Sequence, residues 1–316
     1  MSIFSAFSLF LFSCGSEYSE KEEFKPSILQ VQTTSYPVYY IVERLAFGHD
    51  SLELSCILPV GEDAPHWNPN ADAVLELQQS DLIISNGAQF EPWLQKISIE
   101  EQKIVDSSKG IQLIEIKGET HSHGKEGAHS HVVVDPHTWL DPKSYIQQAR
   151  NIKDALVQID QSHRGVFESG YVTLENDLSS LHQDILNTTT KLRRYQIAAN
   201  YSTYNYFSKR FNLQIQNFDF DPEELPSKEQ VEQFHSYANS VHENKKPAIL
   251  FWERTPTDAV KSSLQPKDTN IQLYHFVVSP LKQPIDDSKY DYIRQSKDNI
   301  KIFEEIVSQL DGLNKK

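Results

Sequence analysis

Hydrophobic and polar positions along the chain predict short strands that alternate with helices. Apolar runs of about 4–8 residues are typical of strands, and apolar positions spaced three and four apart are typical of helices. The first half is expected to contain, in this order, strand 28–32, helix 35–47, strand 52–58, helix 71–79 and strand 81–85. Strands that alternate with helices pair in parallel through right-handed crossovers. The pattern therefore predicts an α/β unit with a mainly parallel sheet.

The same alternation returns in the second half of the chain. This half is expected to contain strand 196–199, helix 202–211, strand 213–218, helix 227–243 and strand 247–252. The repetition predicts a second α/β lobe beside the first. We place the first lobe at 26–160 and the second at 193–316.

A segment without proline, 161–192, separates the two predicted lobes. Its apolar residues recur at intervals of three and four, which marks one face of a long helix. These residues are Phe167, Tyr171, Leu174, Leu178, Leu181 and Ile185. A helix of this length can join the lobes and limit their relative motion, or it can pack on one lobe only. Periodicity alone leaves both possibilities open.

The chain begins with an uncharged apolar run, 3–13, which has the length of a signal-peptide core and is too short to cross a membrane. The run ends at Cys14 in a sequence that resembles a bacterial lipobox, in which the cysteine is lipidated after cleavage. Residues 1–25 are therefore predicted to be a signal segment and a polar tether. The protein is expected to be an exported lipoprotein, anchored in the membrane through Cys14 and facing the periplasm or the cell exterior. A buried N-terminal segment is the alternative.

Charge and cysteine content exclude several classes of protein. The 316 residues include 44 Asp and Glu against 30 Lys and Arg, which gives a formal net charge of −14 and argues against a nucleic-acid partner. Two cysteines cannot form a disulfide framework or a cysteine-based zinc finger. Histidine is unusually clustered, because five of the 12 histidines fall between positions 121 and 137.

Two histidines lie on loops that follow predicted strands, where open parallel sheets bind their ligands. His66 follows the second strand and is flanked by prolines that restrict the backbone. His137 lies between two Asp-Pro pairs. Either Asp135 or Asp141 could accept a proton from the imidazole nitrogen that does not bind a metal. We expect both histidines to be metal ligands.

The polar loop 119–132 is rich in histidine. It contains two His-x-His pairs around a glycine-containing spacer, formed by His121, His123, His129 and His131. Neutral imidazole suits zinc, copper and nickel. We expect a mobile loop that captures metal as an auxiliary site, and an ordinary disordered loop is the alternative.

Several short motifs follow one another along the chain in an order that is similar to that of a known family. The set comprises 33–37, the loop 61–66, the run 81–87 with 90–94, the histidine-rich insertion, and 135–142. In this order the motifs resemble the solute-binding lipoproteins of bacterial zinc and manganese ABC importers. The resemblance implies two Rossmann-like lobes joined by one long helix. It also implies a metal held between the lobes and delivered to a membrane permease.

The resemblance implies four metal ligands, two of which are His66 and His137. The third position falls on Tyr201, where the family commonly has His or Glu. The fourth, commonly Asp before Pro-Leu, falls on Ser279, a poor zinc ligand. His275 and Glu253 are nearby replacements, and we take His66, His137, Tyr201 and Glu253 as the predicted site.

A donor set with little negative charge favours zinc over manganese, which prefers carboxylates, with copper and nickel as further alternatives. The leading hypothesis is therefore a non-catalytic, monomeric zinc receptor for an ABC importer permease. A degenerate member with a role in metal storage, metal delivery or surface interaction is a second hypothesis. A zinc hydrolase is a third, but the sequence contains no His-Glu-x-x-His helix.

Overall fold

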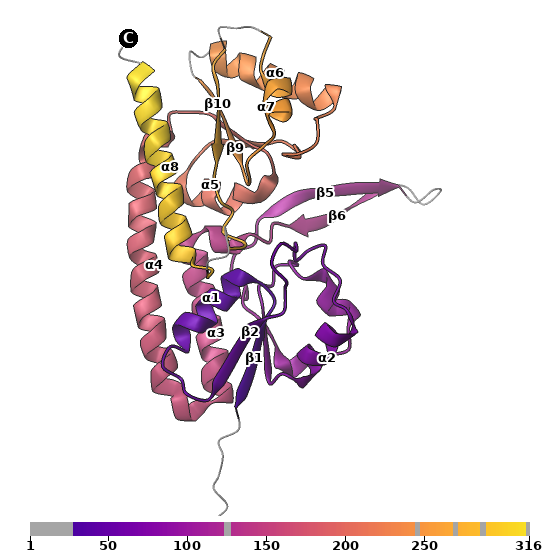
Figure 1. The fold of residues 1–316 in the computed structure, drawn as a ribbon, viewed down its shortest axis with the longest axis vertical. Helices are drawn as coiled ribbons and strands as arrows, with labels where there is room; N and C mark the ends of the chain where they lie inside the picture. Colours follow the sequence, from indigo (N-terminus) through magenta and orange to yellow (C-terminus); the bar gives the residue numbers. More distant parts are fainter. Residues whose placement is uncertain (1–27, 123–127, 244–246, 268–270, 285–288, 314–316) are drawn as a thin grey trace, which may run out of the picture.

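The computed structural model describes residues 28–122, 128–243, 247–267, 271–284 and 289–313 (Figure 1). Within these residues, the strands form two four-stranded parallel sheets and one antiparallel hairpin. The mainly parallel α/β architecture predicted from the sequence is therefore confirmed. The predicted signal segment and tether with Cys14, and His123, lie outside the described residues.

The first sheet has the strand order β2-β1-β3-β4. Its strands are β1 (Leu29–Thr33), β2 (Leu52–Cys56), β3 (Leu82–Ser85) and β4 (Ile104–Asp106). Every residue of β3 is buried, as expected for an apolar strand inside a sheet covered on both faces. The first three strands lie within about two residues of the predicted boundaries, and β4 was not predicted.

Three helices belong to this first lobe, namely α1 (Tyr36–Leu45), α2 (Ala71–Gln79) and α3 (Pro142–Ile159). Their first turns contain the expected starting signals. Asn70 accepts a hydrogen bond from the Ala73 backbone N–H and so caps α2. Asp141 caps α3 in the same way, and Pro142 occupies the first helical position, where no N–H is needed. Helix α3 was not among the elements predicted from the sequence.

The second sheet has the strand order β10-β9-β7-β8. Its strands are β7 (Ile197–Ala199), β8 (Ile215–Asn217), β9 (Ala248–Trp252) and β10 (Leu273–Val277). Its helices are α5 (Asn205–Phe211), α6 (Lys228–Glu243), α7 (Asp258–Leu264) and α8 (Tyr292–Leu313). The predicted helix 202–211 consists of a 3₁₀ turn followed by α5, because the first residues do not continue the α-helical hydrogen bonds. Elements α7, β10 and α8 were not predicted.

The long helix α4 (Arg164–Leu192) runs beside both lobes, and α8 lies alongside its upper part (Figure 1). The predicted apolar face of α4 is buried from Phe167 to Ile185, apart from the half-buried Tyr171. The helix packs against α1 and α3 of the first lobe and against α5 and α8 of the second. Because α4 contacts both lobes, the possibility that it packs on one lobe only is excluded.

One buried apolar cluster continues from the first lobe into the second. It includes Val31 and Ile84 of the first sheet, Leu178 of α4, and Ile197 and Phe251 of the second sheet. Tyr292, at the start of α8, packs its ring on Tyr145 of α3 and donates to the Trp139 carbonyl oxygen at 2.6 Å. The two lobes therefore share a hydrophobic core as well as a linking helix.

Strands β5 (Glu115–Ser122) and β6 (Ala128–Val134) form an antiparallel hairpin that projects from the region between the lobes (Figure 1). The pairing includes His121 opposite His129, and His131 also lies in β6. This strand pairing was not predicted from the sequence, although the three consecutive valines at 132–134 favour it.

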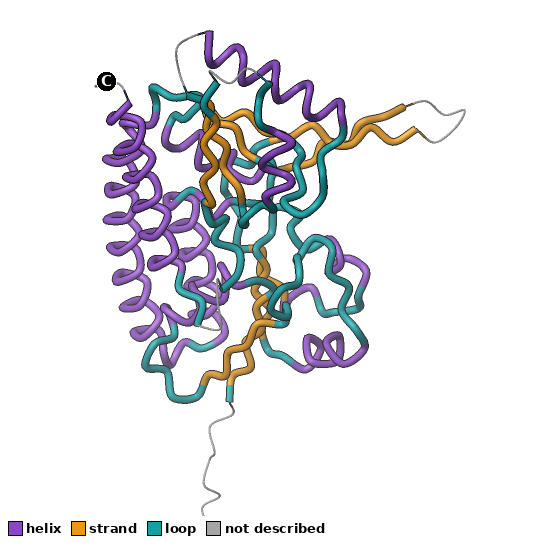
Figure 2. Tube along the Cα trace, turned by 45° about the horizontal axis from the view of Figure 1, so that its top comes forward, coloured by secondary structure: helices purple, strands orange, loops and turns teal. Residues whose placement is uncertain are grey.

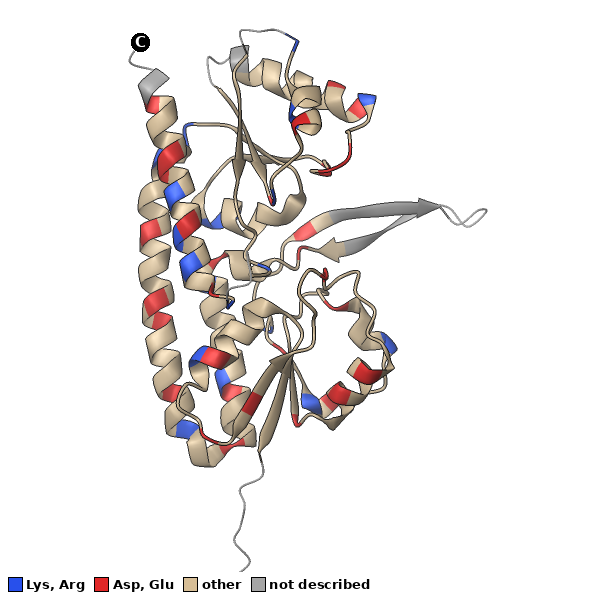
Figure 3. Ribbon diagram, viewed as in Figure 1, with Lys and Arg blue, Asp and Glu red and all other residues tan. Residues whose placement is uncertain are grey.

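Loops and turns gather between the two sheets in Figure 2, where strands of both lobes end. Acidic and basic residues are mixed along α8, whereas the middle of α4 carries acidic residues only (Figure 3). At the start of α4, Arg164 pairs with Glu168 one helical turn away at 3.1 Å. No helix in the described ranges combines the length and the apolar character that a membrane span requires.

Candidate metal centre

His137 lies on the loop between β6 and α3, and its ring is held by Asp135. The Asp135 Oδ1 atom accepts the His137 backbone N–H at 2.9 Å and lies 2.6 Å from the ring Nδ1. Because a carboxylate only accepts hydrogen bonds, Nδ1 carries the ring proton and Nε2 presents its lone pair. The imidazole is 18% exposed, and Phe90 and Trp139 approach it edge to face. This is the geometry of a histidine prepared to bind a metal.

Asp141, the other carboxyl considered as a partner for His137, has a different role. Its oxygens accept from the Lys143 backbone N–H and the Ser144 hydroxyl at the start of α3. Both oxygens also accept from Arg210 of α5, each at 2.6 Å. This two-bonded ion pair connects the lobes, so Asp141 positions helices rather than the imidazole.

The loop of His137 is supported from behind by the residues that follow β3. Asn86 donates from Nδ2 to the Pro136 carbonyl oxygen at 3.0 Å. Gln148 of α3 donates to the Asn86 side-chain oxygen at 3.0 Å, and Glu91 accepts the Asn86 backbone N–H at 2.8 Å. Burial raises the pKa of Glu91 to about 7. The hydrogen bonds that Glu91 accepts from Thr34, Asn86 and Gly87 act in the opposite direction and lower its pKa. The motif around Asn86 therefore supports the histidine loop and is not itself a set of ligands.

His66 lies in the turn region after β2 and is much more open to solvent. Its side chain is 86% exposed, and its Nδ1 lies 2.8 Å from Asp63 Oδ2. As at His137, an acidic partner on Nδ1 leaves Nε2 free for a ligand bond. The two histidines thus share one chemical arrangement, although they differ strongly in burial.

Tyr201 follows β7 and precedes the 3₁₀ turn Ser202–Tyr204. Burial raises the pKa of its phenol to about 12, and the negative charges of Asp221, Asp219 and Glu253 act in the same direction. The phenol is therefore protonated at neutral pH, and a neutral phenol is a weak metal ligand. Tyr201 lines the cleft between the lobes, and its role as a ligand stays a prediction.

Glu253 follows β9 and is only 11% exposed. Its carboxylate accepts a hydrogen bond from the Thr203 hydroxyl and lies 3.2 Å from the Lys282 ammonium. Its backbone N–H donates to Asn200 Oδ1 at 3.1 Å, which fixes the start of the loop. Glu253 is the predicted ligand whose carboxylate lies in the cleft between the lobes.

A cleft of about 800 Å³ lies between loops that leave the strands of both sheets. Its walls include Asp63 from the first lobe and Tyr201, Glu253, Ser279 and Lys282 from the second. His66 and His137 are not among the residues that line it, and His66 is connected to it through Asp63. The structure therefore brings Tyr201 and Glu253 together in the cleft wall, whereas the two histidines lie outside it.

The predicted ligands do not form a closed metal site in this structure. Among the described residues, neither histidine joins two other His, Cys, Asp or Glu side chains whose ligand atoms all lie within 4.8 Å. Sequence reasoning also missed Asp63 and Lys282, both of which line the cleft. The loop 61–66 was recognised, so its acidic residue was available as a signal, whereas Lys282 had no recognisable motif.

Ser279, at the fourth ligand position, and His275, one of its two possible replacements, both make other hydrogen bonds. Ser279 Oγ lies 3.3 Å from Gln295 Oε1 and accepts the Leu281 backbone N–H at 3.1 Å. His275 accepts from the indole N–H of Trp252 at 2.9 Å through Nδ1. Burial lowers the pKa of His275 to about 4, so the ring is neutral. Within the described residues, His275 is not part of the cleft wall.

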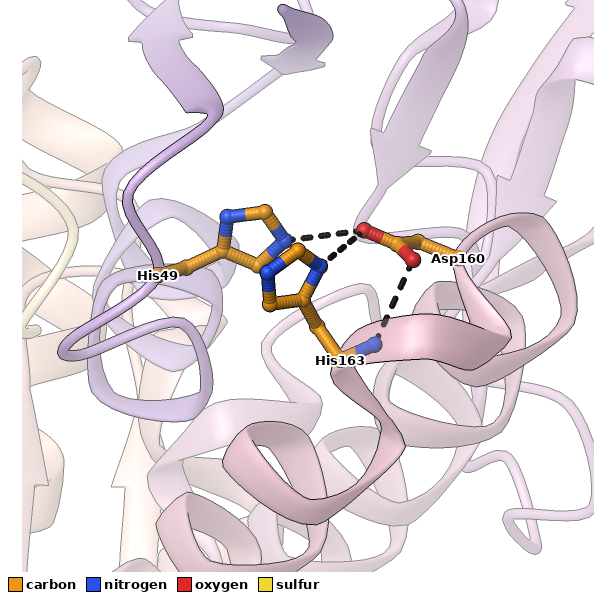
Figure 4. A group of neighbouring side chains, drawn as sticks. All are labelled: His49, Asp160 and His163. Atoms are coloured by element: carbon orange, nitrogen blue, oxygen red, sulfur yellow. Dashed lines mark hydrogen bonds and ion pairs between the residues drawn. The ribbon is translucent and has the colours of Figure 1, made fainter. Parts of the chain in front are cut away.

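A separate cluster of His49, Asp160 and His163 also has metal-ligating atoms close together (Figure 4). Asp160 Oδ2 lies 3.0 Å from His49 Nε2 and 2.7 Å from His163 Nδ1. However, His49 Nδ1 accepts the Ser51 backbone N–H at 3.1 Å, so the ring proton of neutral His49 is on Nε2. A metal would need that same nitrogen deprotonated. The cluster is therefore a hydrogen-bonded junction, in which Asp160 also caps the turn before α4.

Two parallel-sheet lobes with a cleft at the loops that leave their strands define an α/β protein that binds its ligand between lobes. The family of the periplasmic zinc-uptake complex component A, ZnuA, matches residues 31–306, and the chain belongs to this family. Family membership confirms the resemblance inferred from the ordered motifs.

Relatives of known name are distant but extend over most of the chain. The zinc-binding lipoprotein AdcA of Streptococcus pneumoniae R6 is 24% identical over 312 residues, covering 95% of this chain and 59% of that protein. The high-affinity zinc uptake system protein ZnuA of Bacillus subtilis is 24% identical, covering 83% of this chain and 82% of that protein. The Zn(II)-bound ZnuA-like domain of S. pneumoniae AdcA has a TM-score of 0.71 at 21% identity, covering 90% of this chain and 99% of that domain. The chain thus spans about three-fifths of the length of AdcA and matches its ZnuA-like part in fold.

Proposed function

We propose that this protein is a non-catalytic receptor that captures a divalent cation, with zinc as the main cargo, and delivers it to the permease of an ABC importer. The observation that carries the proposal is the Asp135–His137 pair, which leaves the imidazole Nε2 free to bind an ion. Membership of the ZnuA family supports a receptor over a hydrolase. The relatives named as zinc-binding or zinc-uptake proteins support zinc.

In the proposed capture step, His66 and His137 bind the ion through Nε2 from the first lobe. Glu253 supplies a carboxylate oxygen from the second lobe, and water completes the tetrahedron that zinc prefers. Tyr201 closes the cleft wall as a neutral phenol. The four histidines His121, His123, His129 and His131 stay proposed as auxiliary capture residues.

We further propose that the mature protein is a monomer held at the outer face of a membrane through lipid on Cys14. The lipobox-like sequence and the relatives that are named lipoproteins support this placement. A receptor fixed to the membrane in this way stays within reach of a permease, since its tether limits diffusion to two dimensions.

Zinc titration of residues 28–316 by calorimetry tests the proposal. We expect His66→Ala with His137→Ala to weaken zinc binding at least about 100-fold, because two nitrogen donors are lost. Asp135→Asn is expected to weaken it about 10- to 100-fold, since the amide no longer selects the right tautomer of His137. His163→Ala, which removes a histidine from the cluster at Asp160, is the matched control and is expected to bind like the parent. Equal binding by the double variant and the parent would refute the site.

A further inference from the structure

The ammonium group of Lys282 lies between acidic side chains from the two lobes. Its Nζ is 3.2 Å from Glu253 Oε2 of the second lobe and 3.5 Å from Asp63 Oδ1 of the first. These two contacts place the carboxylate oxygens no more than 6.7 Å apart. The other oxygen of Asp63 holds His66, so Lys282 is connected to a proposed zinc ligand through a single carboxylate.

The same two carboxylates would attract a cargo cation to this position. Two carboxylates that face one cleft repel each other and favour a cation between them. The lysine side chain is 27% exposed and Glu253 is 11% exposed, so the pair is shielded from solvent more than an ordinary surface ion pair. The ammonium of Lys282 therefore provides part of the positive charge that a bound metal would bring to these carboxylates.

The backbone around Lys282 is held in place by several contacts. Leu281 has φ of +56°, a left-handed conformation that a branched side chain adopts at a cost. Its carbonyl oxygen accepts from the Tyr290 hydroxyl at 2.7 Å. Gln283 donates to the Glu62 carbonyl oxygen of the first lobe, and its own carbonyl oxygen accepts from Gln295 at 3.1 Å. Strained backbone of this kind persists where surrounding contacts determine it, and it often marks functional positions.

We propose that Lys282 is a built-in competitor for the cargo cation. Its ammonium neutralises Asp63 and Glu253 in the metal-free protein, and it must leave Glu253 before a divalent ion binds to that carboxylate. The inference rests on the proposed function and adds a residue that sets the affinity of the same site. When the ion departs, the ammonium returns to the two carboxylates, which eases release to a permease.

Competition titrations with a fluorescent zinc chelator test this inference on residues 28–316. The variants are Lys282→Gln, which removes the charge, and Lys282→Arg, which keeps it. Lys228→Gln is the matched control, because it removes the same charge from a lysine of α6 that is 91% exposed and pairs only one turn along its own helix, with Glu232. Circular dichroism and thermal unfolding of each variant verify that it folds.

We expect Lys282→Gln to bind zinc about 3- to 30-fold more tightly than the parent, the range for removing two partly shielded ion pairs. The zinc affinity of Lys228→Gln is expected to stay within about twofold of that of the parent. The affinity of Lys282→Arg is expected to be within about twofold of the parent's or weaker. A Lys282→Gln affinity equal to or weaker than that of the parent would overturn the inference while leaving the proposed function intact. An equal gain in Lys282→Arg and Lys282→Gln would also overturn it. If neither the parent nor any variant binds zinc, the proposed function fails together with the inference.

Discussion

Individual residues behind the His137 loop hold that loop in place. Asn86 reaches the Pro136 carbonyl oxygen because the backbone turns sharply after β3 at Gly87, whose φ is +78°. A Cβ atom on Gly87 would lie 1.7 Å from the Asp106 carboxylate. Glycine is required at this position both for its conformation and for space.

We expect Gly87→Ala to reduce the free energy of unfolding by about 2–4 kcal/mol, since the strained conformation and the collision with Asp106 act together. Gly110→Ala is the matched control. Gly110 has φ of +81°, but a Cβ there would meet no atom within 4 Å, so only the conformational cost of about 1 kcal/mol applies. Urea unfolding of both variants measures the difference. Equal losses in the two variants would show that the contact with Asp106 is unimportant.

At the scale of elements, the N-terminus of α3 connects the lobes. Asp141 caps α3 and also accepts two hydrogen bonds from Arg210 of α5. Tyr206, also of α5, accepts the Ile114 backbone N–H at 3.1 Å through its hydroxyl oxygen, just before β5. Helix α5 thus contacts both the first lobe and the base of the hairpin, although it has only seven residues.

Arg210→Met is expected to lower the free energy of unfolding by about 1–2 kcal/mol. The buried carboxylate of Asp141 would lose its charged partner, while the partly exposed position of Arg210 limits the loss. Arg164→Met removes an exposed pair along α4 and should cost no more than about 0.5 kcal/mol. Denaturant unfolding compares the two. A cost for Arg210→Met as small as that for Arg164→Met would show that the interlobe pair adds no stability.

At the scale of the whole molecule, the lobes share one core and a set of direct hydrogen bonds. The Trp139 indole N–H donates to the Pro280 carbonyl oxygen at 2.9 Å, and the Tyr292 hydroxyl donates to the Trp139 carbonyl oxygen. Trp139 is fully buried at this junction. A wide opening of the cleft would break these bonds and expose the shared apolar cluster to water. The linking helix and this junction therefore favour a small motion.

Small-angle X-ray scattering of metal-free and zinc-saturated protein tests that expectation. We expect the radius of gyration to change by less than about 0.5 Å, because opening the lobes would expose apolar surface at roughly 25 cal/mol per Å². Trp139→Phe, which keeps the aromatic ring but removes the indole donor, should allow a larger change. A change of several Å in the parent would indicate a hinge of the kind that the shared core disfavours.

The recurring strands and the face of the long helix were predictable because their signals are local. Central strands such as β3 and β9 are continuous apolar runs, and the apolar positions of α4 repeat every three or four residues. Helices α3 and α8 were not predicted, although the buried positions Tyr145, Ala149, Ile152 and Leu156 of α3 recur at the same spacing. The hairpin was missed because its histidines and glycines suggested an unpaired loop.

The sequence by itself determined the α/β class, the order of the sheets along the chain, and the two loops that carry His66 and His137. Local periodicity and short motifs encode these features, because each depends on residues that are close in the chain. Only the tertiary structure decided that Asp135 rather than Asp141 orients His137 and that Lys282 lies between Asp63 and Glu253. Lys282 joins the two lobes by its contact with Asp63, and Asp141 pairs with Arg210 of the second lobe instead of with His137. No local pattern specifies which side chains meet in this way when the lobes pack.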